Sequence, residues 1–230
     1  MTHMVAALIA HDARLQFRYG IYAAYGVVAA IYVGLLLTFG PQVPTWAVAV
    51  LIFTDPAALG FFFLGALMML ERAEGVRTAL AVTPVGATTY LSAKVVTLTG
   101  TALLACLAIV ATHPSATNLP LLISTVALTS MQYVGLGVPI ALRFRTVSGY
   151  LLGSAALLTP LIAPAFLALL EPFPTWLLVI PAVAQQRLLL IATGTPASAV
   201  EIALALVIAA AACAAALGFG RASLRKELGK

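Results

Sequence analysis

Ionisable side chains are scarce in this chain of 230 residues, and one of them, Asp55, lies within a long apolar run. A carboxyl group at such a depth is costly to bury, and it could carry a proton or contact a polar solute. Pro56 lacks a backbone N–H, so Thr54 and Asp55 could line a local break in a helix. The alternatives are that Asp55 pairs with Arg187 or with a backbone donor, or that it faces a subunit interface.

A second group of charges lies between two apolar runs, in the stretch Glu71–Pro84 (ERAEGVRTALAVTP). Charged and apolar side chains are mixed there: Glu71, Arg72, Glu74 and Arg77 with Val76, Leu80 and Val82. This pattern predicts a short amphipathic helix along the membrane surface, ended by Thr83-Pro84, whose charges can dock on another protein. An ordinary solvated loop is the alternative.

Motifs of known catalytic or nucleotide-binding sites are absent from the sequence. It contains no HExxH, no GxSxG and no His and Cys cluster at ligand spacing. Its only Gly-Lys pair is Gly229-Lys230, so it has no P-loop. Cys106 and Cys213 lie within apolar runs, as packing residues do. We expect no enzyme activity, no metal and no cofactor in this chain, and any uphill transport needs an ion gradient or a separate ATPase.

The elements that must position these residues are membrane-spanning helices. The chain is 63% hydrophobic and 8% charged, whereas soluble domains carry about 25% charged residues. Because about 20 apolar residues cross the hydrocarbon core as a helix, the apolar runs predict six spans in a single all-α membrane domain, residues 1–230. The spans are residues 21–39, 46–70, 89–111, 120–142, 147–170 and 199–220. Pro160 and Pro164 predict a kink in the fifth.

Two further segments lie outside the spans. Residues 1–20 alternate apolar and charged side chains, which predicts an interfacial amphipathic helix, with a frayed tail as the alternative. Residues 171–198 hold two apolar stretches, 176–180 and 188–192, that are each too short to cross alone. Gln185-Gln186-Arg187 interrupts the segment, and we predict a re-entrant pair of short helices in the outer leaflet rather than a seventh span.

The distribution of basic residues predicts the topology. With six spans and both termini in the cytoplasm, 11 of the 12 lysines and arginines lie inside: Arg14, Arg18, Arg72, Arg77, Lys94, Arg143, Arg145, Arg221, Arg225, Lys226 and Lys230. Arg187 alone lies outside, and Lys94 counts as inner if its side chain snorkels back to the interface. This rule also explains the net charge of +5, which therefore predicts no nucleic-acid partner. We expect a multi-pass protein of the cell membrane.

The residues between the second and third spans resemble a known family. Glu71-Arg72-x-x-Gly75, Leu80, Thr83-Pro84 and Tyr90-Leu91-x-x-Lys94 are similar to the coupling-helix region of ABC-2 type exporter permeases. The lead-in, the six apolar runs and the broken outer segment agree, so the likeness covers nearly the whole chain. Thr54-Asp55-Pro56 and Leu70-Glu71-Arg72 resemble the small fluoroquinolone-export permeases in particular. Many members have Gly-Thr-Leu-Glu where this chain has Gly75-Val76-Arg77-Thr78.

The resemblance implies a permease without its own motor, with a cytoplasmic coupling helix in residues 71–88. Two copies, or this chain and a paralogue, would pair in the bilayer, each docked on an ABC ATPase subunit that binds ATP and Mg. Glu71 and Arg72 would anchor the helix, Glu74 and Arg77 would contact the ATPase, and Gly75 would allow close approach. Leu80, Thr83 and Pro84 complete the motif. The second and fifth spans would line the translocation path, at Thr54, Asp55, Phe61 and Phe62.

On this interpretation the chain exports an amphipathic small molecule, such as a fluoroquinolone, or a lipid. Two functions of other classes stay open. One is a proton-coupled carrier that uses Asp55, and the other is a membrane scaffold that transports nothing.

Overall fold

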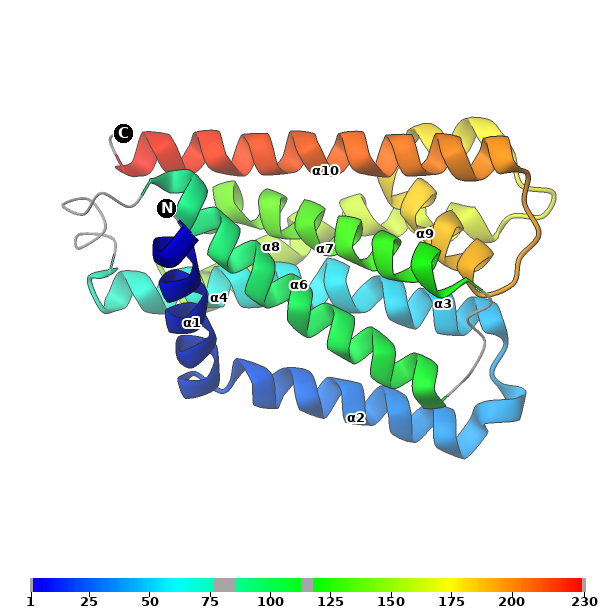
Figure 1. Ribbon diagram of the computed structural model, residues 1–230, viewed down its shortest axis with the longest axis horizontal. Helices are drawn as coiled ribbons and strands as arrows, with labels where there is room; N and C mark the ends of the chain where they lie inside the picture. Colours follow the sequence, from blue (N-terminus) through cyan, green and yellow to red (C-terminus); the bar gives the residue numbers. More distant parts are fainter. Residues whose placement is uncertain (1, 77–85, 113–117, 229–230) are drawn as a thin grey trace.

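The computed structural model describes residues 2–76, 86–112 and 118–228. Within these ranges the chain forms helices joined by turns and short connections, with no strand. The long helices run side by side along one axis, and α1 and the last turns of α10 lie at the same end of the bundle (Figure 1). We call this the termini end and the opposite one the far end.

In the described part of the chain, six helical stretches are long and apolar enough to cross a membrane, which confirms the predicted number and positions of the apolar helices. They are α2 (Ile21–Phe39); α3 (Thr45–Thr54), η2 (Asp55–Leu59) and α4 (Gly60–Ala73) in one stretch; α6 (Ala87–Thr112); α7 (Leu119–Ala141); α8 (Val147–Ile162) with η3 (Ala163–Leu169); and α10 (Ala199–Leu228). A short helix, η1 (Gly40–Gln42), joins the first two stretches.

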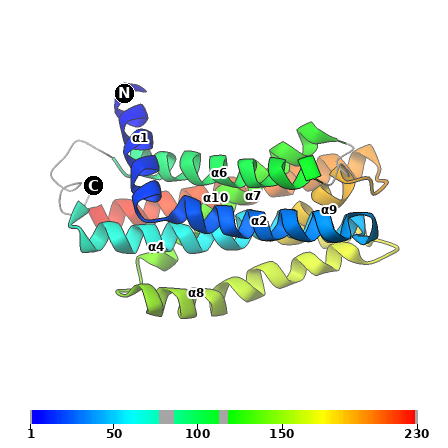
Figure 2. The same cartoon turned by 90° about the horizontal axis from the view of Figure 1, so that it is seen from below.

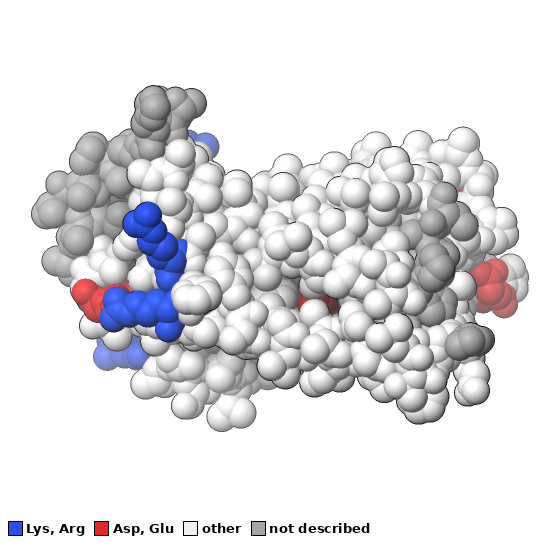
Figure 3. Space-filling model, turned by 60° about the horizontal axis from the view of Figure 1, so that its bottom comes forward, with Lys and Arg blue, Asp and Glu red and all other residues white. Residues whose placement is uncertain are grey.

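The surface of this bundle fits a lipid environment. Large apolar side chains are exposed along α2, α6, α8 and α10, among them Val27, Leu104, Leu152 and Val207. Figure 3 shows the charged side chains of one face gathered toward the two ends of the long axis, apart from a small recessed acidic patch near the middle. An apolar band between two charged ends is the surface that a bilayer requires.

Helix α1 (Thr2–Arg18) runs across the bundle axis rather than along it, as both views show (Figures 1 and 2). Gly20, at φ +72°, takes the left-handed conformation in the turn that leads from α1 into α2. The side of α1 that packs on the bundle buries Asp12, Leu15 and Gln16, whereas Phe17 is 78% exposed. Polar residues therefore dominate the inward face of α1.

Two of the spanning stretches depart from regular α-helix. In the second stretch, the π-helical turn η2 separates α3 from α4. In the fifth, the α-helix gives way to the 3-10 helix η3 at Ala163, next to Pro164, as the predicted kink requires. Helix α8 lies at the edge of the bundle and packs against α4 (Figure 2).

The segment of residues 171–198 contains the 3-10 helix η4 (Thr175–Val179) and the α-helix α9 (Pro181–Ala192). At 1.5 Å per residue, the 12 residues of α9 span about 18 Å, too short to cross a bilayer. Gln185, Gln186 and Arg187 lie inside α9, so the prediction that they interrupt the segment is wrong. All three are buried, because α9 packs between α3, α7, α10 and η3 at the far end.

The tightest helix packing joins α7 to α10. A Cβ added at Gly135 would lie 2.7 Å from the backbone carbon of Ala216, and one at Gly220 would lie 2.7 Å from the carbonyl oxygen of Gly135. Only glycine at these positions lets the two backbones approach so closely.

Candidate functional site

The charged stretch was predicted to follow the second span, but its first residues belong to the last helix of that span. Glu71 and Arg72 lie in the last turn of α4, so the prediction that a separate helix starts at Glu71 is wrong. Gly75, at φ +74°, adopts the left-handed conformation that commonly ends a helix, and its N–H donates to the carbonyl of Arg72 at 3.1 Å. The remaining residues predicted for the coupling helix, Arg77, Leu80, Thr83 and Pro84, lie outside the described residues.

Glu71 points into the bundle and is 3% exposed. Its carboxylate accepts hydrogen bonds from the ammonium of Lys94 and from the hydroxyl of Tyr90, both on α6. Lys94 is itself 1% exposed and also bonds to the carboxylate of Asp12 on α1. One lysine thus joins α1, α4 and α6. We call Asp12, Glu71 and Lys94 the buried charge cluster.

Polar neighbours complete the buried charge cluster. Gln16 donates from Nε2 to Asp12 Oδ2 at 2.8 Å and to Thr97 Oγ1 at 2.7 Å, and the Thr97 hydroxyl also bonds to Asp12. The ring of Tyr90 lies 5.2 Å from Lys94 Nζ, within range of a cation–π interaction. Two carboxylates face a single ammonium here, so these donors stabilise the second negative charge.

The sequence placed Asp12 and Lys94 on the correct elements but Glu71 on a separate helix, and it did not reveal that the three residues pair. Lys94 was expected to snorkel toward water, and this expectation is wrong, because its ammonium is enclosed by two carboxylates. A usable signal was present. Asp12, Glu71 and Lys94 all lie on the same predicted side of the membrane, with charges that can neutralise one another.

Beside the buried charge cluster, the end of α4 carries exposed charges. Glu74 lies 3.2 Å from Arg18 of α1, with side chains 36% and 69% exposed. Arg72 is exposed and donates from Nη1 to the carbonyl of Phe144, between α7 and α8, at 3.4 Å. Exposed pairs of this kind contribute little free energy, so these side chains can exchange their partners at low cost.

A groove of about 330 Å³ lies between the second and fifth spanning stretches. Its described lining is Thr54, Ala58, Phe62, Ala155, Leu158, Thr159, Ile162, Ala163 and Phe166. Two of the four residues predicted for a translocation path, Thr54 and Phe62, line this groove. Phe61 does not: it is fully buried, and Tyr150 stacks on it and donates its hydroxyl hydrogen to the Phe61 carbonyl at 2.7 Å.

Asp55, the fourth predicted path residue, is 2% exposed in the π-helical turn η2. Neither carboxylate oxygen has a hydrogen-bond partner among the described residues. The alternative that pairs it with Arg187 is wrong, because Arg187 bonds to Glu201 and Glu171 instead. Burial inside one chain also rules out an exposed interface position. Among the described residues, Asp55 is therefore a buried carboxyl group without a partner, which is costly unless it serves a function.

Groups of metal-ligating side chains and pairs of cysteines would be further candidate sites in the described part of the chain. Within it, no group of three His, Cys, Asp or Glu residues is placed to hold a metal ion. Cys106 and Cys213 are buried and unbridged, as expected of packing residues.

The six long apolar helices, by their length and composition, are typical of multi-pass membrane proteins, and buried ion pairs join helices at each end of the bundle. No protein-family model, curated protein or solved structure matches the chain. The features of the chain that bear on its function are the buried charge cluster, the groove and Asp55.

Proposed function

We propose that this chain is the membrane-spanning subunit of an exporter driven by a separate ATPase, which docks at the termini end. The observation that supports this most is the buried charge cluster, because it ties the end of α4 to α1 and α6. The exposed charges of Arg72 and Glu74 lie one and three residues after Glu71 in the chain. A force applied to them would be passed through Lys94 to three helices at once.

A movement of the end of α4 would reach the groove, because the same helical stretch lines it. Helices α4 and α3 form one stretch with the turn η2, and Thr54 and Phe62 of this stretch line the groove. Mid-helix π-turns are frequent at functional sites, so η2 is a reasonable hinge between the driven end and the groove. The lining is mostly apolar with two threonine hydroxyls, Thr54 and Thr159, which suits an amphipathic solute such as a drug molecule or a lipid.

The topology follows the basic residues. On this proposal the termini end faces the cytoplasm, because the lysines and arginines of the described ranges belong to elements at that end, apart from Arg187. The segment with η4 and α9 then lies at the outer side as a re-entrant segment, shielded by protein. Two copies, or this chain and a paralogue, pair in the cell membrane, and ATP and Mg bind to the partner ATPase alone.

Co-purification tests the proposal. The chain is extracted in mild detergent, and the associated proteins are searched for a subunit with a P-loop whose ATP hydrolysis responds to added solute. The exposed variants Arg72→Ala and Glu74→Ala are expected to reduce the amount of this subunit recovered. Lys226→Ala, an exposed basic residue near the end of α10, is the matched control and is expected to leave recovery unchanged.

Unchanged recovery in both variants would rule out docking through the end of α4. Failure to recover any ATPase that responds to solute would leave a scaffold as the better interpretation.

A proton-coupled carrier is the second candidate, and the unpartnered carboxyl group of Asp55 favours it. Asp55→Asn separates the two functions. A carrier that moves protons through this carboxyl group should lose coupling to the proton gradient, whereas an ATP-driven exporter should keep transport that depends on ATP. Transport into vesicles, driven in turn by a pH gradient and by ATP with the purified partner, measures the difference.

A further inference from the structure

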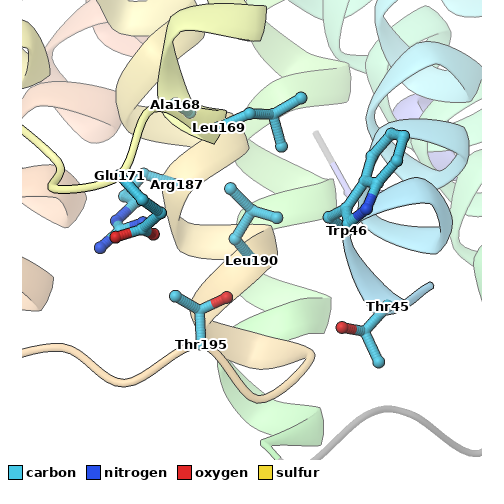
Figure 4. A pocket seen from close by; sticks show the side chains of 8 residues that line it. All are labelled: Thr45, Trp46, Ala168, Leu169, Glu171, Arg187, Leu190 and Thr195. Atoms are coloured by element: carbon cyan, nitrogen blue, oxygen red, sulfur yellow. The ribbon is translucent and has the colours of Figure 1, made fainter.

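A pocket of about 440 Å³ opens at the far end, away from the buried charge cluster and with no lining residue in common with the groove. It is lined by residues of α3, η3 and α9 and of the connections beside them: Thr45, Trp46, Ala168, Leu169, Glu171, Arg187, Leu190 and Thr195. Figure 4 shows Glu171 and Arg187 on one side, Trp46 and Thr45 on the other, and Leu190 between them. Its volume is within the usual range for a small organic ligand.

At this pocket two carboxylates, those of Glu171 and Glu201, share the single positive charge of Arg187. Arg187 is 4% exposed, and its Nε donates to Glu201 Oε1 at 2.7 Å, so these two buried groups neutralise each other. The second contact of Arg187, from Nη1 to Glu171 Oε1, is longer, at 3.3 Å. The side chain of Glu171 is 67% exposed, and no other lysine or arginine lies among the described residues of the lining. Its negative charge is thus only partly compensated.

Arg187 is not available to an anion. Besides its two carboxylate contacts, its guanidinium carbon lies 4.4 Å from the centre of the Phe173 ring. An anionic ligand would have to displace a buried, well-partnered carboxylate, whereas a cation can approach Glu171 from the open side.

The remaining lining supplies an apolar surface. Trp46 is half exposed and presents its ring across the pocket from Glu171, with Leu190 between the two (Figure 4). Tryptophan is the aromatic side chain that attracts cations most strongly, and Leu169 and Leu190 add aliphatic contact.

We propose that this pocket binds an organic cation with an apolar body, whose charge lies beside Glu171 and whose body lies against Trp46. The ligand is either a free amphipathic cation or the ammonium headgroup of a lipid. The inference does not depend on the proposed exporter function, since binding requires this chain alone.

Trp46 provides the signal for the test. The chain has two tryptophans, and Trp176 is not among the pocket residues, so Trp176→Phe leaves Trp46 as the sole tryptophan, which can be excited selectively. In uncharged maltoside detergent, tetraphenylphosphonium is expected to change the Trp46 emission saturably. Glu171→Gln in the same background should weaken the apparent affinity about fivefold, as expected for the loss of one partly exposed charge contact. Glu227→Gln, at the termini end, is the matched control and should bind as before.

Charge and shape are separated by tetraphenylborate, which has the same shape and the opposite charge and should give no saturable change. Rising salt should weaken phosphonium binding to the Trp176→Phe chain, an expectation that holds even if Glu171→Gln does not fold. The proposal would be overturned if tetraphenylphosphonium and tetraphenylborate bound equally well. It would also be overturned if phosphonium binding changed neither with salt nor with Glu171→Gln.

Competition identifies the natural source of the cation. Phosphatidylethanolamine added to the detergent should displace tetraphenylphosphonium if a lipid ammonium is the ligand, and phosphatidylglycerol should not. If neither lipid competes, the ligand is a free organic cation.

Discussion

Lys94 is the residue on which the termini end of the bundle depends most. Its ammonium is the only positive charge in the buried charge cluster, and it faces the carboxylates of Asp12 and Glu71. Removing one member of a buried ion pair leaves the other charge without compensation, which costs far more than an exposed pair is worth.

Lys94→Met is therefore expected to lower the free energy of unfolding by about 3–5 kcal/mol. Thermal unfolding in detergent, followed by circular dichroism, measures the change, and Lys226→Met, at an exposed position, is the control with little effect expected. The combined variant Asp12→Asn, Glu71→Gln, Lys94→Met carries no uncompensated charge and should recover much of the loss. If Lys94→Met unfolds like the control, the cluster does not hold the helices together.

Replacing Asp55 is expected to have the opposite effect on stability. Since its carboxylate oxygens have no partner among the described residues, Asp55→Leu removes a buried polar group without breaking a bond. The variant is expected to unfold at a higher temperature, by an amount equivalent to about 1–3 kcal/mol, while losing any transport that uses the carboxyl group. Thermal unfolding and vesicle transport are measured on the same preparation. Lower stability in Asp55→Leu would mean that the carboxyl group has a partner in the native membrane.

Among the elements, α7 and α10 form the closest pair, and their contact depends on glycine. Gly220→Ala would bring a methyl group to 2.7 Å from the backbone of Gly135 and force the helices apart. We expect a loss of about 1–3 kcal/mol in the free energy of unfolding. Gly218→Ala, two residues away on the same helix, has no atom within 4 Å of the added carbon and should be neutral or slightly stabilising. Equal unfolding temperatures for the two variants would contradict this packing.

How much of the structure the sequence predicted depends on the physical range of each interaction. Hydropathy is a local property, so the helices at residues 21–39 and 147–169 were predicted within a residue. The burial of α9 was not, because its glutamines and Arg187 look like surface residues until their neighbours are known. Likewise, the bond between Lys94 and Asp12 joins residues 82 positions apart, and no local pattern encodes it.

At the scale of the whole molecule, the prediction concerns sidedness. An even number of spans puts both termini on one side, and the basic residues predict that this side is the cytoplasm. In a Cys106→Ala, Cys213→Ala background, Ala199→Cys at the far end should react with an impermeant maleimide in intact cells. Ser148→Cys, at the exposed start of α8, should react only after the membrane is opened. Reversed labelling would place the charged end of α4 outside the cell, where no ATPase could reach it.

The crosswise position of α1 also has a consequence for biogenesis. Asp12 and Glu71 leave the ribosome before Lys94, so the nascent chain carries two acids without their common counter-ion until its third span has been made. The first two spans can be locked in place only at that moment. Translation products that stop before residue 94 should accordingly stay loosely assembled and be removed by membrane proteases, whereas longer ones should persist.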